Sequence, residues 1–235
     1  MKKIIFTLLF ASSLILTAQE KEEKTFTLSG SVDTYFRGNI SGGNFDTAPG
    51  SSFANQPGFA LGMINLIAGY EGEKVGFVAD MVYGPRGADA VFGSPAGSAQ
   101  IVNQLYAYWN VSEKVTLTLG NFNTFLGYEV ISPTANFNYS TSYLFSYGPF
   151  SHTGIKADIA LSENTSLMLA VMNPTDATEF NPTGNYAFGA QLGFSGQYIN
   201  FLLDNGAYEI DFTGGFDLSE TFFLGVNAAY FSGDD

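Results

Sequence analysis

The 235-residue sequence has no cysteine, a single histidine and few charged residues. Without cysteine there is no disulfide framework, no thiolate metal site and no lipid attached to an N-terminal cysteine. Charged residues make up 13% of the chain, about half of the ~25% that is usual for soluble domains. The polar strand faces that a soluble domain covers with lysine and glutamate carry serine, threonine, asparagine, glutamine, glycine and tyrosine instead.

Basic residues are scarcer than acidic ones, with nine lysines and arginines against 22 aspartates and glutamates. Two of the nine, Lys2 and Lys3, lie at the very start of the chain. Binding to a phosphate backbone needs the opposite balance of charge. We therefore exclude nucleic acid as a partner.

Only one long apolar run is present, from Ile4 to Leu16, and it follows Lys2 and Lys3 and precedes small residues. This order is typical of a secretory signal peptide, and the run is shorter than the ~20 residues of a membrane-spanning helix. We expect residues 1–18 to be a signal peptide. Residues 19–235 are then one exported domain without a helical anchor.

The single histidine, His152, is a weak candidate for catalysis. Asp158 lies six residues along the same predicted strand, roughly 20 Å away, which is too far for it to orient the imidazole. No cluster of histidine and cysteine could bind a transition metal, and no segment has the spacing of a calcium-binding loop. We predict a protein that is not an enzyme and has no cofactor, with His152 as a polar turn residue.

What the sequence has instead is alternation of apolar and polar residues, which is typical of strands with two different faces. Residues 26–40 are the clearest example. We expect one set of positions to face lipid: Phe26, Leu28, Val32, Phe36 and Ile40. The other set includes Asp33, Tyr35 and Arg37, which we expect to face a lumen. After the signal peptide no segment has a convincing helical period, so the fold class is all-β.

The same pattern predicts eleven strands, at residues 26–40, 58–71, 75–84, 101–111, 114–124, 152–161, 165–173, 185–194, 197–203, 208–218 and 221–231. Their connections alternate between short turns, such as 112–114 and 162–165, and mostly longer loops, such as 41–57, 85–100, 125–151 and 174–184. Aromatic residues gather near the short turns: Tyr70, Trp109, Phe194, Tyr198, Phe216 and Phe222. Short turns at one end, long loops at the other and aromatic girdles indicate a transmembrane antiparallel up-and-down β-barrel.

Eleven is an odd number, whereas bacterial single-chain barrels have an even number of strands and no open edge. The sequence also ends on Asp235 rather than on an aromatic residue. We therefore expect the barrel to continue beyond residue 235, so that residues 19–235 are an incomplete barrel.

Three segments carry a resemblance to a known family: DMVYGPRG at 80–87, LGNFNTFLGYE at 119–129, and the stretch from Asn136 to Gly154. With them the chain resembles the OmpL-like β-barrel porins (porin-2 type) of Gram-negative bacteria. The resemblance implies an outer-membrane pore and assigns no binding residue. The GPRG tetrapeptide at 84–87 lacks the lysine and serine or threonine of a phosphate-binding loop, so we interpret it as a turn that caps a strand.

A pore needs a polar lining, and the alternation supplies candidates. The predicted lining residues are Asp33, Tyr35, Arg37, Asp80, Tyr106, Lys156, Asp158, Glu209, Asp211 and Asp217. Since carboxylates outnumber basic groups among them, we predict a channel for small hydrophilic solutes that favours cations. Pairing of Arg37 and Lys156 with these carboxylates in a filled interior is the alternative, and it would suit a surface receptor or adhesion barrel.

The loop at 125–151 is too long for a simple connection, and it is rich in tyrosine and phenylalanine. We expect it to fold inward and narrow the pore. The expected partners are thus the lipid of the outer membrane and small hydrophilic solutes. The sequence is also compatible with a homo-oligomer.

Overall fold

A computed structural model of the chain describes residues 24–43, 46–48, 54–91 and 99–233. The signal peptide expected at 1–18 lies outside these residues. The strands are β1 (Thr25–Arg37), β2 (Gly58–Glu71), β3 (Val75–Tyr83), β4 (Val102–Ser112), β5 (Val115–Asn123), β6 (Ser151–Ala160), β7 (Thr165–Met172), β8 (Ala187–Phe194), β9 (Gln197–Asp204), β10 (Ala207–Ser219) and β11 (Phe222–Ser232).

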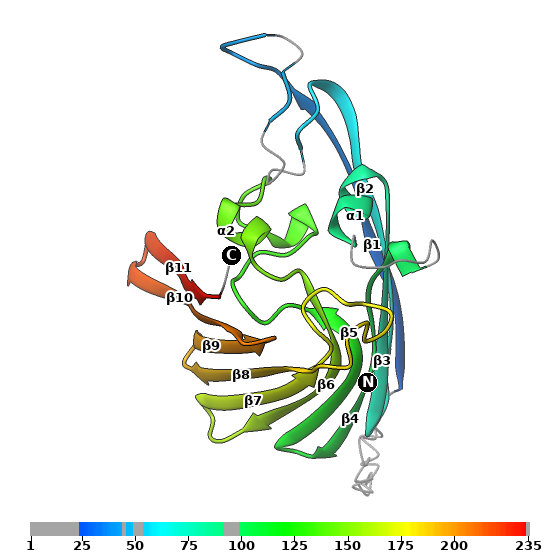
Figure 1. Ribbon diagram of the computed structural model, residues 1–235, viewed down its shortest axis with the longest axis vertical. Helices are drawn as coiled ribbons and strands as arrows, with labels where there is room; N and C mark the ends of the chain where they lie inside the picture. The colour runs from blue at the N-terminus through cyan, green and yellow to red at the C-terminus, as the bar shows by residue number, and fades with distance from the viewer. Residues whose placement is uncertain (1–23, 44–45, 49–53, 92–98, 234–235) are drawn as a thin grey trace, which may run out of the picture.

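All eleven strands form one antiparallel sheet in which each strand pairs with the next one along the chain. The predicted all-β, up-and-down order is confirmed, with strand ends that differ from the expected ones by three residues or fewer. The sheet curls, and β1 and β11 are the two edges of the described part (Figure 1). This curvature is consistent with the wall of a barrel.

Two short helices in the loops were not predicted, α1 (Pro85–Ala90) and α2 (Tyr143–Tyr147). The interpretation of GPRG as a simple turn was wrong, because α1 begins at Pro85. Proline suits the first turn of a helix, and Gly84 precedes it with a φ of 102° that favours glycine. Single 3₁₀ turns occur at Ala99–Ile101 and Pro133–Ala135. No helix in the described ranges is long and apolar enough to cross a membrane.

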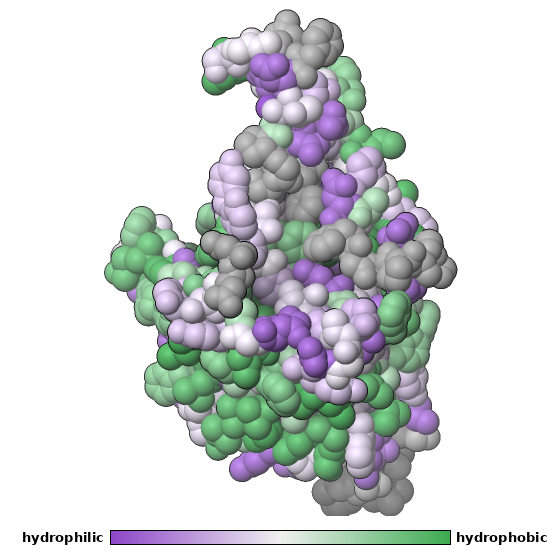
Figure 2. All heavy atoms as spheres, in the orientation of Figure 1, coloured by the Kyte–Doolittle hydropathy of each residue, from purple (hydrophilic) through white to green (hydrophobic). Residues whose placement is uncertain are grey.

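The outer face of the sheet is apolar and exposed. On β1, Phe26, Leu28, Val32 and Phe36 each leave 64–74% of their surface uncovered. Comparable residues continue around the sheet, among them Leu105, Leu119, Leu169, Phe188 and Ile199. Figure 2 shows this surface as a hydrophobic band over the lower strands. A soluble monomer rarely exposes so large a continuous apolar surface, whereas acyl chains would cover it.

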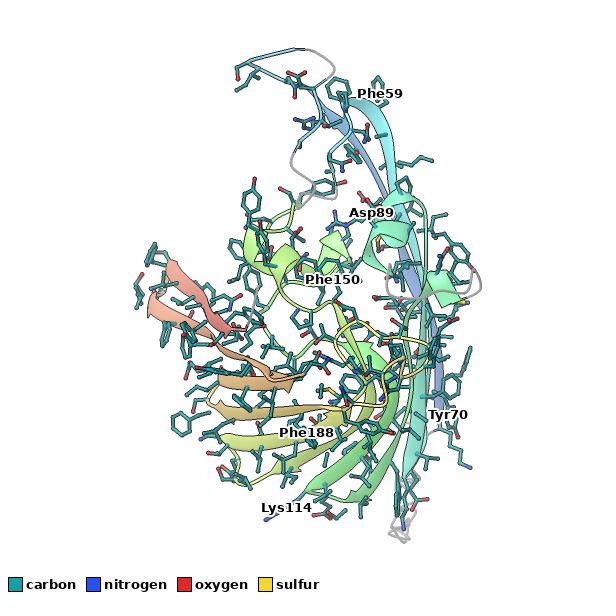
Figure 3. The ribbon with its side chains drawn as sticks, in the orientation of Figure 1. Phe59, Tyr70, Asp89, Lys114, Phe150 and Phe188 are labelled. Atoms are coloured by element: carbon teal, nitrogen blue, oxygen red, sulfur yellow. The ribbon has the colours of Figure 1, made fainter. Side chains whose placement is uncertain are left out.

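The inner, concave side of the sheet is filled in part by the long connection between β5 and β6, residues 124–150, which contains α2 (Figure 1). In Figure 3 Phe59 and Tyr70 project from β2 away from this connection, whereas Phe150 lies on the inner side. Phe150 and Phe145 stack at 4.6 Å in a buried cluster with Met63 and Val82. A second buried cluster joins the start of the loop to β7, β8 and β9. The loop is therefore packed against the inner wall.

Candidate solute pathway

The loop at 124–150, called the inner loop below, is attached to strands on opposite sides of the sheet. At its start, the backbone N–H of Gly127 donates to Asp211 Oδ1 on β10 at 2.9 Å. Further along, the hydroxyl of Tyr139 donates to Asp33 Oδ1 on β1 at 2.8 Å. Since β1 and β10 lie near the two edges of the sheet, the inner loop crosses the concave space from one side to the other. The inward folding predicted for 125–151 is thereby observed.

Asp33 can reach the inner loop because of a local irregularity in the sheet. The pairing of β1 with β2 shifts at this residue, between Val32 and Thr34. Its carboxylate lies over Gly62, where a Cβ atom would come within 1.8 Å of Oδ2. Any side chain at position 62 would push the carboxylate away. The missing side chain thus leaves room for Asp33 to accept the Tyr139 hydroxyl.

Arg86 on α1 also holds the inner loop in place, and its side chain is fully buried. Its Nε donates to the carbonyl of Ile131 at 2.8 Å and its Nη1 to the carbonyl of Tyr139 at 3.2 Å. The guanidinium carbon lies 5.5 Å from the centre of the Tyr139 ring, within the range of a cation–π contact. Burial lowers the pKa of Arg86, while the charge of Asp33 raises it.

The inner loop also has internal structure. The carboxylate of Glu129 accepts hydrogen bonds from the N–H and the hydroxyl of Ser142. Ser142 is the N-cap of α2, and its hydroxyl accepts from the N–H of Phe145. Asn136 donates to the carbonyl of Val130 and accepts from its N–H. These bonds satisfy polar groups that a buried loop would otherwise leave unpaired.

Beside the inner loop, the concave side of the sheet lines an open hollow of about 590 Å³, called the lower cavity below. It reaches from Phe125 and Tyr128 in the loop down to Tyr108 and Thr116, near the short turn that joins β4 to β5. Burial first, and then the charge of Glu129, raises the pKa of Tyr128, so its hydroxyl stays neutral at cellular pH. The lower cavity is a path along the inner wall that the loop does not fill.

Three of the predicted lining residues meet in the lower cavity: Tyr106, Lys156 and Asp158. Lys156 Nζ lies 2.7 Å from Asp158 Oδ2, so the alternative that Lys156 pairs with a carboxylate is present in the structure. Two residues apart on one strand, these side chains share the inner face. Their charges cancel within the cavity.

Asp80 and Asp211 also face inward but are buried among amides. Asp80 is 4% exposed and accepts hydrogen bonds from the side chains of Asn65, Asn103 and Gln104. Asp211 is 1% exposed and accepts from Asn200, Thr213, Asn227 and the Gly127 N–H. Neutral donors stabilise these carboxylates without cancelling their charge.

Glu209 and Asp211 line a small gap on the other side of the inner loop, together with Glu129. Sequence reasoning did not identify Glu129 because it lies in the loop, outside the alternating strands. Three carboxylates therefore border the gap.

Three other predicted residues lie away from both spaces. Arg37 donates to the carbonyls of Asp46 and Asn55 in the β1–β2 loop. Tyr35 accepts from the N–H of Gln56, and its ring centre lies 6.2 Å from that of Tyr139. Asp217 is exposed near the short turn after β10.

The prediction that His152 is a polar turn residue was wrong. It lies in β6 with 1% of its surface exposed, and its ring centre is 5.1 Å from that of Phe125. Its Nε2 lies 3.1 Å from Thr124 Oγ1. The rings of Phe122 on β5 and Phe125 in the inner loop lie against it, so it belongs to the packing at the base of the loop.

The aromatic girdle also needs one correction, at Tyr198. This residue pairs with Gly193 on the inner face and lines the lower cavity. Tyr70, Trp109 and Phe222 lie on the outer face as expected.

Comparison with known proteins gives one family. The family model for β-barrel porin-2, OmpL-like, matches residues 25–235. No curated protein sequence matches the chain significantly. Because the family match covers all eleven strands, the chain belongs to the OmpL-like β-barrel porins.

Proposed function

We propose that this OmpL-like β-barrel porin is a passive channel of the outer membrane for small hydrophilic solutes, with the inner loop as its constriction. The observation that carries the proposal is the pairing of an exposed apolar outer face with a concave polar side that a structured loop crosses without filling. Lipid requires the first, and a hydrated path requires the second.

The channel favours cations. Asp80, Asp211, Glu209 and Glu129 are inward-facing carboxylates for which the structure gives no ion pair, whereas Lys156 is paired with Asp158. Arg86 lies near Asp33 and balances it. The charge of these carboxylates therefore gives the space around the inner loop a net negative potential, which favours cations.

Channel activity is tested with the full-length protein in planar lipid bilayers. Discrete conductance steps, together with swelling of liposomes in small neutral solutes, are the expected result. A surface receptor or adhesion barrel with a filled lumen would give neither. Such a silent, folded protein would overturn the proposal.

Cation preference is tested by the reversal potential in a KCl gradient, with Glu209→Gln as the variant. Glu209 borders the gap beside the inner loop, so loss of its charge lowers the permeability ratio of K⁺ to Cl⁻. The control Glu220→Gln removes the same charge from the exposed turn after β10 and leaves the ratio unchanged. An anion preference in the unmodified protein would contradict the assignment.

A further inference from the structure

Tyrosines on the inner wall lie directly opposite glycines of the neighbouring strand. The pairs are Tyr106 with Gly120, Tyr108 with Gly76, and Tyr198 with Gly193. A Cβ atom on Gly76 would come within 2.3 Å of the Tyr108 ring, and one on Gly193 within 3.0 Å of the Tyr198 ring. The glycines therefore give these two rings room to lie down against the sheet.

A ring that lies on the wall presents its face, rather than its edge, to the space it lines. All three tyrosines line the lower cavity, with Phe122 and Phe125 beside them. Hydroxyl and amide groups lie between the rings, among them those of Thr116, Thr118, Gln104, Gln191 and Thr213. Apolar faces alternate here with hydrogen-bonding groups, so the cavity suits a solute that has both.

The charge of the lower cavity narrows the class of solute further. Lys156 and Asp158 are the charged residues that line it, and they pair with each other at 2.7 Å. An ionic solute would find no unpaired counter-charge there. A purely apolar solute would displace the water bound to the hydroxyl and amide groups and would offer them no hydrogen bonds in return, which is costly.

We propose that the lower cavity is a binding site for a neutral sugar, with Tyr108 and Tyr198 as stacking surfaces. A pyranose ring has an apolar face of C–H groups and a rim of hydroxyls, which matches flat tyrosines separated by amides and hydroxyls. The volume of about 590 Å³ falls within the ~300–1,000 Å³ of small-molecule sites. The inference rests on the proposed channel function and names the solute that the channel takes.

The two parts of the pathway then have different tasks. The carboxylates beside the inner loop act on ions, while the neutral tyrosine-lined cavity holds the sugar on the side toward the short turns. Ion preference and sugar binding should therefore respond to different substitutions. Glu209→Gln changes the first and leaves the second unchanged.

The test uses maltose as the probe and the full-length protein in planar bilayers and liposomes. Maltose should interrupt the ion current in a saturable manner, and it should enter liposomes faster than a polyethylene glycol of similar hydrodynamic radius. The double variant Tyr108→Leu/Tyr198→Leu should bind maltose about tenfold more weakly, since each stacked ring contributes roughly threefold or more. Its ion conductance should persist.

Tyr83→Leu is the matched control, because Tyr83 lies on the outer face of β3 and does not line the cavity. It should bind maltose as the unmodified protein does. Ion conductance without a maltose block, or equal entry of maltose and the polymer, would overturn the sugar site and leave the channel standing. Absence of any conductance would instead refute the channel itself.

Discussion

Replacement of Arg86 by methionine should release the inner loop. Methionine replaces the aliphatic stem of the arginine but has no group that can donate to the carbonyls of Ile131 and Tyr139. Hydrogen bonds from a charged group contribute about 1.5–3 kcal/mol each. The substitution also removes the positive charge near Asp33, whose carboxylate raises the pKa of Arg86 in the unmodified protein, and a buried carboxylate that loses its cation is strongly destabilising in its own right.

Water forms hydrogen bonds with the freed carbonyls when the inner loop moves, and this offsets part of the lost interaction energy. We therefore take about 3 kcal/mol as the net loss of stability of the loop in its observed, closed position. At about 1.4 kcal/mol for each factor of ten, the ratio of closed to released loop falls roughly a hundredfold. The released state leaves more of the concave side open. We therefore expect single-channel recordings of Arg86→Met to show a larger conductance and more frequent transitions between levels.

The control is Arg37→Met, which removes an arginine that donates to Asp46 and Asn55 in a different loop. Arg86→Lys should lie between the two, because an ammonium keeps the charge but not the planar fork that reaches two carbonyls. Where Arg86→Met does not fold, Tyr139→Phe removes the bond to Asp33 and leaves the ring in place. Conductance equal to that of the unmodified channel in both variants would show that these contacts do not hold the inner loop in place.

Two further predictions concern stability. Burial raises the pKa of Asp176, and the N–H groups of Ser151 and Phe150 donate to its Oδ1. The protonated carboxyl of Asp176 therefore contributes to the free energy of unfolding at a pH below its ordinary pKa near 3.8, and this contribution falls as the pH rises through the raised pKa. Asp176→Asn should keep both hydrogen bonds and make the free energy of unfolding in urea less dependent on pH. Asp176→Ala should cost about 1–3 kcal/mol, and equal stability of the two variants would contradict this. Leu169→Arg, on the exposed outer face, should destabilise the protein in lipid by about 2–4 kcal/mol. Glu163→Arg in a short turn is the control and should have little effect on stability. An equally small loss of stability for Leu169→Arg would argue against lipid contact.

The strands could be predicted because alternation depends on local chemistry alone. Each strand has one face toward lipid and one toward the interior, so residues such as Leu117 and Thr118 report their own environment. The short helices could not be predicted in this way. α1 has six residues and α2 has five, which is too short for a helical period to stand out.

The candidate site depended on contacts that the sequence does not display. Arg86 acts on carbonyls 45 and 53 residues further along the chain, and the burial of His152 depends on where Phe125 comes to rest. The sequence predicts Tyr198 to be in the girdle because it lies near a strand end. Its neighbour Asn200, a polar residue in an apolar strand, marks the inner face and was the available signal.

The glycines opposite the tyrosines show why composition alone cannot distinguish a tyrosine of the outer aromatic girdle from a tyrosine that lines the lower cavity. Glycine in a strand interior weakens the strand because its backbone loses more conformational entropy on folding and it has no side chain to pack. At Gly76 and Gly193 that loss is offset by the ring that lies over each of them. An aromatic residue across from a bulky side chain would have to stand up into the pathway. An inward-facing tyrosine therefore lies flat along the wall when the residue opposite it on the neighbouring strand is glycine, and it projects into the channel and narrows it when that residue is bulky.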